Sequence, residues 1–312
     1  MRIVKVVLFF VIVCIAANIG FLYLAPEKFT EFAINMERKR SGLERKEINL
    51  PGNLQYVYLE GGKGEPLMLL HGFGANKDNF TRVARFLTPH YRVIIPDHIG
   101  FGESSHPQDA DYSAGAQATR VKTLAKALGI TKLHLGGSSM GGYISMMYAA
   151  LYPEDVKSLW LLDPGGIWSA PPSELREILV KTGKNPLMAQ NEDEFAKIFA
   201  FVMAEPPFIP RPILNVMAQE RILNYDLEKR IFKEISTGSA EHYVTGLKTP
   251  TLIVFGQKDR VIHPDTANIL HKLMPNSEVM IMKGLGHLPM IENPRQSAQD
   301  YLGFRNKLDK TQ

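Results

Sequence analysis

A serine flanked by glycines lies between a strand pattern and a helical pattern. Residues 137–141 read Gly-Ser-Ser-Met-Gly, which fits G-x-S-x-G with Ser139 at the centre. The strand pattern covers 132–135 and the helical pattern 143–151. In such a segment the serine lies on a tight turn where flanking glycines leave room, because they lack Cβ atoms. Ser139 is therefore a candidate nucleophile, although a glycine-rich loop without chemistry has the same pattern.

Two later residues can complete this chemistry. A serine hydroxyl needs a histidine base to remove its proton, and the base needs a carboxylate that fixes its tautomer. Asp259 follows a strand pattern at 251–255, and His287 follows another at 278–282. Open α/β sheets bind their ligands at the carboxyl ends of strands. We therefore predict that Ser139, Asp259 and His287 form a catalytic triad. The alternative is that Asp259 is an ordinary turn residue and His287 an ordinary loop residue.

Attack on a carbonyl also requires N–H donors for the oxygen that becomes negative. The residue after the nucleophile usually supplies one donor, which here is the backbone N–H of Met140. The second is expected from the loop at 71–74, His-Gly-Phe-Gly, which directly follows the apolar strand pattern at 67–70. Phe73 is the candidate for this second donor, although a plain strand-exit turn would look the same.

The elements that must position these residues alternate between strand and helix. Strand patterns occur at 54–60, 66–70, 91–95, 132–135, 156–162, 251–255 and 278–282, and helical patterns at 78–87, 114–128, 143–151 and 294–308. This alternation is typical of an α/β fold with a mostly parallel sheet flanked by helices. The first strand pattern, 54–60, is expected to be a half-buried edge strand.

Four helical patterns without a clear strand pattern separate the last two strands from the others. They lie near 172–182, 192–204, 211–223 and 225–236, with prolines at several of their edges. We therefore predict a core at 51–166 and 247–312, interrupted by a helical cap at 167–246. Asp163, at the end of the strand that leads into this cap, is the alternative to Asp259 as the triad acid.

The N-terminal segment is apolar and uncharged from Val6 to Ala25. About 20 helical residues at ~1.5 Å rise span the ~30 Å core of a bilayer. Residues 1–25 are therefore expected to be a membrane anchor or a signal segment, and we favour the retained anchor, because the small residues Ala16 and Ala17 lie inside the apolar run. Residues 26–50 are expected to form a charged stalk, helical over 27–48, that is either solvated or lies on the membrane surface.

The basic residues on the two sides of this span give opposite signals about its orientation. Arg2 and Lys5 precede it and place the catalytic domain on the non-cytoplasmic side, which we favour. Five basic residues between 38 and 46 follow the span and favour the cytoplasmic side. Cleavage of the segment would instead give a secreted protein.

Composition excludes several other classes of function. The net charge is only +4, and no basic stripe with interleaved aromatics occurs, so nucleic acid is not an expected partner. A single cysteine, Cys14, excludes an intrachain disulfide framework and a cysteine metal site. Since the sequence has neither a metal-ligand cluster nor a dinucleotide or phosphate loop, we expect no cofactor and no metal.

Five segments together resemble the α/β-hydrolase superfamily. They are His71-Gly-Phe-Gly, Pro96-Asp-His-Ile-Gly-Phe-Gly-Glu-Ser104, Gly137-Ser-Ser139-Met-Gly-Gly, Gly256-Gln-Lys-Asp259 and Gly286-His287. They occur in the family's order, each at a strand end, and the resemblance spans about residues 53–304. His98 departs slightly from the residues common in the second segment, which is a structural one. The resemblance implies an α/β-hydrolase fold and a serine hydrolase that forms an acyl-enzyme on Ser139.

A narrower resemblance concerns the substrate. The N-terminal span, the Leu70–Asp78 segment and the cap resemble those of bacterial lipases and membrane-bound monoacylglycerol lipases, which implies a lipase or esterase acting on an acyl ester or glyceride. The cap carries apolar side chains suited to acyl chains, some of which should face the active-site cleft: Trp168, Phe195, Phe199, Phe201, Met203, Phe208, Ile213, Met217 and Ile222.

Two other functions stay open at this point. A carbon–carbon bond hydrolase of the same fold also uses a Ser-Asp-His triad under a cap, and it would need basic cap residues such as Arg176, Arg211 or Arg221 for an acidic substrate. A non-catalytic hydrolase-like binding protein would be expected to have a broken triad. The sequence leaves acyl-chain length and oligomeric state open.

Overall fold

The protein is built around one eight-stranded sheet, which we describe from a computed structural model covering residues 2–311. The strands are β1 (Leu43–Leu50), β2 (Leu54–Gly61), β3 (Pro66–Leu70), β4 (Arg92–Pro96), β5 (Leu133–Ser138), β6 (Val156–Leu162), β7 (Thr251–Gly256) and β8 (Ser277–Met282). Their order is β1-β2-β4-β3-β5-β6-β7-β8. β1, β2 and β4 pair antiparallel, and the strands from β4 to β8 pair parallel. The expected mostly parallel α/β sheet is confirmed.

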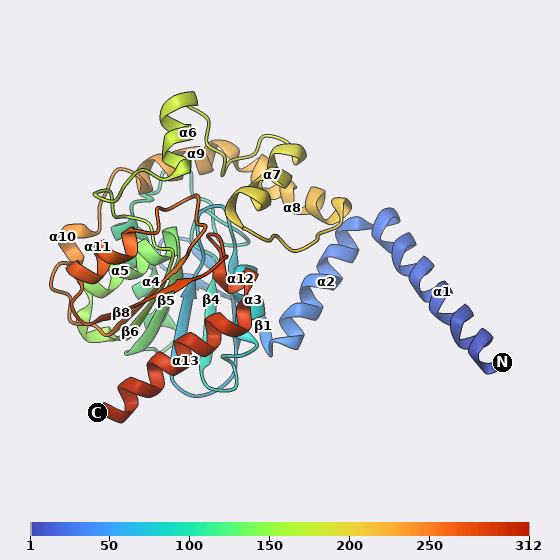
Figure 1. The fold of residues 1–312 in the computed structure, drawn as a ribbon, viewed down its shortest axis with the longest axis horizontal. Coiled ribbons are helices and arrows are strands. Elements are labelled where there is room, and N and C mark those ends of the chain that lie inside the picture. Colours follow the sequence, from blue (N-terminus) through green and yellow to red (C-terminus); the bar gives the residue numbers. More distant parts are fainter. Residues whose placement is uncertain (1, 312) are drawn as a thin grey trace.

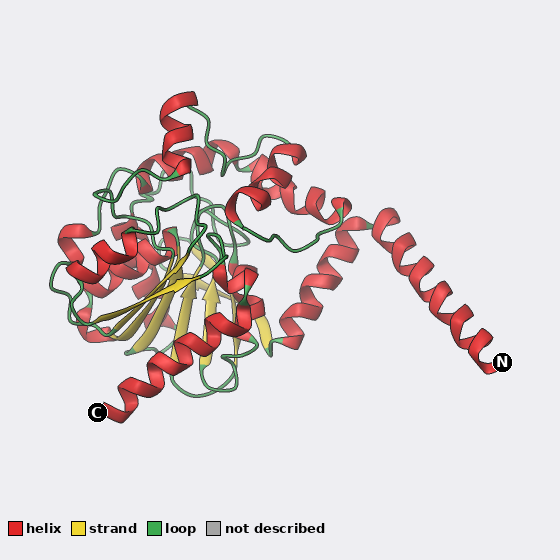
Figure 2. Ribbon diagram, in the orientation of Figure 1, coloured by secondary structure: helices red, strands yellow, loops and turns green. Residues whose placement is uncertain are grey.

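Helices cover both faces of this sheet (Figures 1 and 2). One face is covered mainly by α4 (Ala114–Ala127), α5 (Met140–Leu151) and α11 (Thr266–Leu273), and the other by α3 (Thr81–Ala84), α12 (Pro289–Glu292) and α13 (Pro294–Thr311). In β3, Met68 and Leu70 pack into the first core, whereas Leu67 and Leu69 pack into the second. Because successive side chains of a strand point to opposite faces, a strand buried on both faces is apolar throughout.

The helices inserted between β6 and β7 lie over one end of the sheet (Figure 1). They are α6 (Glu174–Thr182), α7 (Glu192–Val202), α8 (Arg211–Leu223), α9 (Tyr225–Ile235) and α10 (Glu241–Val244). Leu175, Phe195, Ile198 and Ala218 from three of these helices form an apolar cluster of their own, which also contains Val261 of the core. The cap is thus packed within itself and onto the loop that follows β7.

Two expectations for the N-terminal part are wrong. The helix expected over 27–48 is α2 (Pro26–Arg40) and ends at Ser41-Gly42, where Gly42 adopts φ 65°. Residues 43–50 form the edge strand β1 instead, so the strand at 54–61 is not at the edge. β1 buries only its two ends and carries charges between them, which hides a strand pattern. One of these charged side chains forms an ion pair across the strands, since Lys46 Nζ lies 2.8 Å from the carboxylate of Glu60 on β2.

Another expected helix is shorter than the pattern indicates. The helical pattern at 78–87 becomes a 3₁₀ turn, η1 (Lys77–Phe80), and the single turn α3. A second 3₁₀ turn, η2 (Pro153–Asp155), leads from α5 into β6. Thr88 precedes a proline, and a residue in that position is disfavoured in a helix, which accounts for part of the shortening.

The N-terminal helix α1 (Arg2–Leu24) extends away from the body of the molecule (Figure 1). Its segment Val4–Leu24 is long and apolar enough to cross a membrane, and it is also placed where a signal sequence would be. In contrast, α2 is fixed to the core, because Arg38 donates two hydrogen bonds to the Asp78 carboxylate, at 2.7 and 2.6 Å. The helix after α1 is therefore part of the folded domain and not a free linker.

Candidate active site

Ser139 occupies a strained turn between β5 and α5. Its φ of 55° and ψ of −117° are unusual for a residue with a side chain, and such a conformation costs roughly 1–3 kcal/mol unless the surroundings hold it. The glycines around it are required. A Cβ atom on Gly137 would lie 2.2 Å from the Gly141 carbonyl oxygen, and one on Gly141 would lie 2.1 Å from the Leu70 oxygen. The turn therefore presents the half-buried Ser139 side chain at the end of the sheet.

His287 and Asp259 form a buried pair close to this turn. The His287 Nδ1–H donates to Asp259 Oδ2 at 2.7 Å, and both residues are less than a tenth exposed. Asp259 Oδ1 accepts the N–H groups of Val261 at 2.7 Å and Ile262 at 3.1 Å, two residues that line the same cavity as Ser139. With Nδ1 donating to a carboxylate, His287 Nε2 is left as the basic nitrogen. The cap holds the His287 backbone, whose N–H donates to Val202 O at 2.8 Å.

Asp163 lies against this pair without bonding to the histidine. Its Oδ1 accepts the Gly256 N–H at 2.8 Å, whereas Oδ2 is buried and has no partner in the described part of the chain. Complete burial, and then the charge of Asp259, raise the pKa of Asp163 well above its usual range, which favours the neutral form of this carboxyl. Of the two candidate acids, Asp259 is the one that holds His287.

The same three residues also have the spacing of a metal site. Ligand atoms of Asp163, Asp259 and His287 lie within 4.8 Å of one another, and no other group of this kind occurs among the described residues. However, the direct hydrogen bond between His287 and Asp259 uses Nδ1 and Oδ2. A metal held by these atoms would have to break that bond, so the geometry fits a proton-handling pair better.

The loop at 71–74 passes next to the serine. A Cβ atom on Gly72 would come within 3.2 Å of the Ser139 Cβ, so glycine is needed for this approach. His71 fixes the loop, because its Nδ1–H donates to Gly72 O at 2.8 Å and its Nε2 accepts the His98 N–H at 3.0 Å. Burial lowers the pKa of His71 to about 4, which keeps the ring neutral and able to accept that bond. In the sequence, only the glycines of this loop and its position directly after β3 indicated that it would approach the nucleophile.

A cap residue also holds this loop. Arg221 of α8 donates from Nη1 to Gly74 O at 2.7 Å, from Nη2 to Leu187 O at 2.7 Å and from Nε to Glu228 at 2.6 Å. Its guanidinium carbon lies 5.8 Å from the centre of the Phe73 ring. Because Arg221 is 147 residues from Gly74, no local sequence pattern could have indicated this contact.

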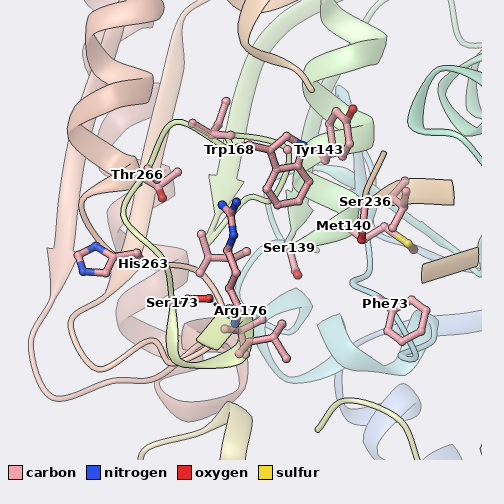
Figure 3. Close-up of a pocket in the computed structure, with 18 of the residues that line it drawn as sticks. Phe73, Ser139, Met140, Tyr143, Trp168, Ser173, Arg176, Ser236, His263 and Thr266 are labelled. Carbon is pink, nitrogen blue, oxygen red and sulfur yellow. Dashed lines mark hydrogen bonds between the residues drawn. The ribbon is translucent and has the colours of Figure 1, made fainter. Parts of the chain in front are cut away.

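Ser139 opens into a cavity of about 330 Å³ between the core and the cap (Figure 3). Its wall is mainly apolar and includes Phe73, Met140, Tyr143, Trp168, Leu175 and Phe232. Of the cap side chains expected near the site, Trp168 lines the cavity, whereas Phe195, Phe201 and Met203 are buried in the cap's own cluster. Ser139, Phe73 and Met140 thus lie on one cavity, and Asp259 accepts hydrogen bonds from the backbone of two residues in its wall, Val261 and Ile262.

Comparison with known proteins places this geometry in context. The family described as alpha/beta hydrolase fold matches residues 65–198. Lipase 1 of Psychrobacter immobilis is 46% identical over 287 residues, which cover 90% of each chain. Monoacylglycerol lipase ABHD6 of Homo sapiens is 28% identical and covers 82% of this chain and 81% of its own. The crystal structure of a membrane phospholipase A, a bacterial virulence factor, has a TM-score of 0.89 with 37% identity, covering 98% of this chain and 99% of that one.

Proposed function

The chain belongs to the α/β-hydrolase lipases and is a serine hydrolase of carboxylic esters, and we propose that Ser139, Asp259 and His287 are its catalytic triad. The observation that carries this proposal is the 2.7 Å hydrogen bond from His287 to Asp259, beside the cavity into which the strained Ser139 turn opens. This arrangement supplies a nucleophile, a base and the carboxylate that orients the base.

The reaction proceeds in two halves. His287 Nε2 takes the proton from Ser139 Oγ as this oxygen bonds to the ester carbonyl carbon, and the N–H groups of Phe73 and Met140 bind the carbonyl oxygen as it becomes negative. His287 then gives the proton to the departing alcohol oxygen, and the C–O bond breaks to leave an acyl group on Ser139. Water, deprotonated by His287, attacks this acyl group; His287 then returns the proton to Ser139 Oγ as the bond from Oγ to the acyl carbon breaks, which releases the acid and restores the enzyme. Asp259 stabilises the charged histidine in both halves.

The substrate class follows from the lipase family and the cavity. Lipases hydrolyse lipid esters, and an apolar wall suits an acyl chain. A volume of about 330 Å³ is near the lower end of ligand pockets, which favours short to medium chains. Of the three basic cap residues that a carbon–carbon hydrolase could use, Arg211 pairs with Asp193 and Arg221 with Glu228, so that alternative depends on Arg176, which lines the cavity.

A fluorophosphonate probe together with p-nitrophenyl esters of graded chain length tests this proposal. Ser139→Ala is expected to abolish labelling, and His287→Ala and Asp259→Asn to lower kcat on the order of 10⁴–10⁶-fold. Ser138→Ala, one residue away and buried under the turn, is the matched control and should label as the native protein does. Labelling that persists in Ser139→Ala would show that another residue is the nucleophile.

We further propose that α1 is retained as a membrane anchor and that the catalytic domain lies on the non-cytoplasmic side. The uncharged span, the preceding Arg2 and Lys5, and the membrane phospholipase among similar structures support this arrangement. Intact protein mass after carbonate extraction of membranes tests retention, and protease treatment of intact spheroplasts tests the side. A protein that loses its first 20 or so residues, or that is released by carbonate, would contradict the anchor.

A further inference from the structure

The cavity beside Ser139 has one permanently charged side chain in its wall. This is Arg176 of α6, and no carboxylate occurs among the described lining residues. Figure 3 shows its side chain rising through the cavity beside Ser139, with the guanidinium close to Trp168. The charge therefore lies on the same cavity as the nucleophile.

Arg176 differs from the other arginines of the cap. Arg211 pairs with Asp193, Arg221 with Glu228 and Arg230 with Glu234. Within residues 2–311, in contrast, no ion pair joins Arg176 to a carboxylate. The nearest acidic residue before it on α6, Glu174, is occupied by two hydrogen bonds from Arg260, both at 2.6 Å. Arg176 is exposed to solvent as well as lining the cavity, so its guanidinium is hydrated and available to an anion that enters there.

Two polar side chains of the cavity lie on the same side as Arg176, whereas Ser236 lies beside Met140. Figure 3 shows His263 and Thr266 on the side away from Phe73, with Arg176 between them and Ser139. Thr266 is fully buried, and its hydroxyl has no hydrogen-bond partner among the described residues. The cavity thus carries its one charge at Arg176, on the side away from Phe73. An acyl chain fits the apolar wall, and an anionic group fits beside Arg176.

We propose that Arg176 binds the phosphate of a glycerophospholipid whose acyl ester is attacked by Ser139, an inference that rests on the proposed function above. A neutral glyceride offers no anion to a guanidinium, whereas a phosphodiester is only a few bonds from the glycerol esters. The planar fork of arginine matches phosphate oxygens with two parallel hydrogen bonds. Arg176 is thus a specificity-determining residue that selects phospholipids over acylglycerols of equal chain length.

The test compares two substrates that differ only in the headgroup: dioctanoylphosphatidylglycerol and dioctanoylglycerol, each in the same neutral detergent micelles. Arg176→Gln is expected to lower kcat/KM for the phospholipid about 10- to 100-fold, mainly through KM, as for loss of a hydrogen bond to a charged group. Hydrolysis of dioctanoylglycerol and p-nitrophenyl octanoate should change less than about twofold, and Arg176→Lys should recover part of the loss.

Lys181→Gln is the matched control. It removes the same charge from α6 at a position outside the cavity wall, so it reports any general effect of charge on micelle binding. Inhibition by octanoate and by glycerol 3-phosphate separates the two sources of an anion. Stronger inhibition by glycerol 3-phosphate, lost in Arg176→Gln, supports the phosphate site. Inhibition by octanoate alone would assign Arg176 to the fatty-acid product and overturn the proposal.

Failure of this proposal is distinct from failure of the proposed function. If the native protein neither labels with fluorophosphonate nor hydrolyses p-nitrophenyl esters, the triad proposal fails. If it does both, and Arg176→Gln keeps the native ratio of phospholipid to diacylglycerol hydrolysis, only the phosphate site is refuted. An equal loss in Lys181→Gln would also refute it, because the effect would then come from overall charge.

Discussion

Replacing Arg221 by methionine should show that the cap controls the loop next to the nucleophile. The change keeps an unbranched side chain but removes three hydrogen bonds, to Glu228 at 2.6 Å, Gly74 O at 2.7 Å and Leu187 O at 2.7 Å. Arg221 and Glu228 are both less than a tenth exposed. The variant therefore leaves a buried carboxylate and two carbonyl groups without the donor that the native fold supplies.

The expected loss of stability is about 3 kcal/mol near pH 7, the lower end of the 3–5 kcal/mol typical of a broken buried ion pair. Burial already raises the pKa of Glu228, and without Arg221 the pKa rises further, so protonation limits the cost. The folded variant then binds a proton that the unfolded chain releases above about pH 4.3. Its stability should consequently fall, relative to the native protein, as pH rises from 5 to 8.

Activity should fall by a different route. Gly74 O is no longer held, so the Phe73 N–H proposed to bind the oxyanion loses its fixed position. Complete loss of one such donor costs about 10²–10³ in kcat, and a loosened donor should cost roughly 10- to 100-fold. KM for p-nitrophenyl esters should change little, because the apolar wall of the cavity remains.

The double variant Arg221→Met/Glu228→Leu separates the two effects. It replaces the buried ion pair by apolar side chains, which is often close to neutral for stability. Chemical unfolding of the full chain in detergent should therefore show most of the stability restored, whereas kcat stays low because Gly74 O still lacks its donor. Native kcat in Arg221→Met, or full recovery of kcat in the double variant, would refute a link between the cap and the loop.

Three further changes test other parts of the molecule. Asp163→Asn keeps a partner for the Gly256 N–H and should retain activity within about tenfold. Because burial raises the pKa of Asp163, this residue makes the native protein less stable as pH rises above the pKa of the unfolded chain. Urea unfolding from pH 5 to 8 should show no such contribution in the variant. His98→Leu removes a buried ring whose pKa burial lowers well below its usual range. Below about pH 6.5 the native protein gains a proton on this histidine when it unfolds, which lowers its stability in acid. The free energy of unfolding should therefore fall less between pH 7 and pH 5 in the variant than in the native protein. Gly303→Ala, in α13 with nothing within 4 Å of the added Cβ, should raise stability by about 0.5–1 kcal/mol and Tm by a few degrees, and an unchanged or lower Tm would contradict the helix-propensity argument.

Much of the fold could be predicted because its signals are local. The pattern at 156–162 predicts β6 with the bounds that the structure has, and the pattern at 211–223 does so for α8. Strands buried on both faces are continuous apolar runs, and prolines mark several edges of the cap helices. The alternation of strand and helix patterns predicted the sheet, and four successive helical patterns predicted the insertion.

The parts that sequence could not supply depend on contacts between distant residues. β1 is recognisable only by its pairing with β2, since its buried side chains, Leu43 and Leu50, are at its two ends. The contact of Arg221 with Gly74 depends on how the cap lies on the core, which no period in the sequence encodes. The same holds for Arg176. Only the structure shows that it lines the cavity, and that the three other cap arginines pair with carboxylates whereas Arg176 has no such pair among the described residues.

The choice between Asp163 and Asp259 shows how tertiary structure decides a chemical role. Both residues follow adjacent parallel strands, β6 and β7, so the sheet brings both carboxyl groups to the same place. Asp259 accepts hydrogen bonds from Val261, Ile262 and His287, which stabilise a negative charge. Asp163 accepts only the Gly256 N–H in the described structure and is completely buried, which favours its neutral form. The turn after β7, by supplying two more N–H donors, therefore makes Asp259 the carboxylate that orients His287, whereas Asp163 is its buried neighbour.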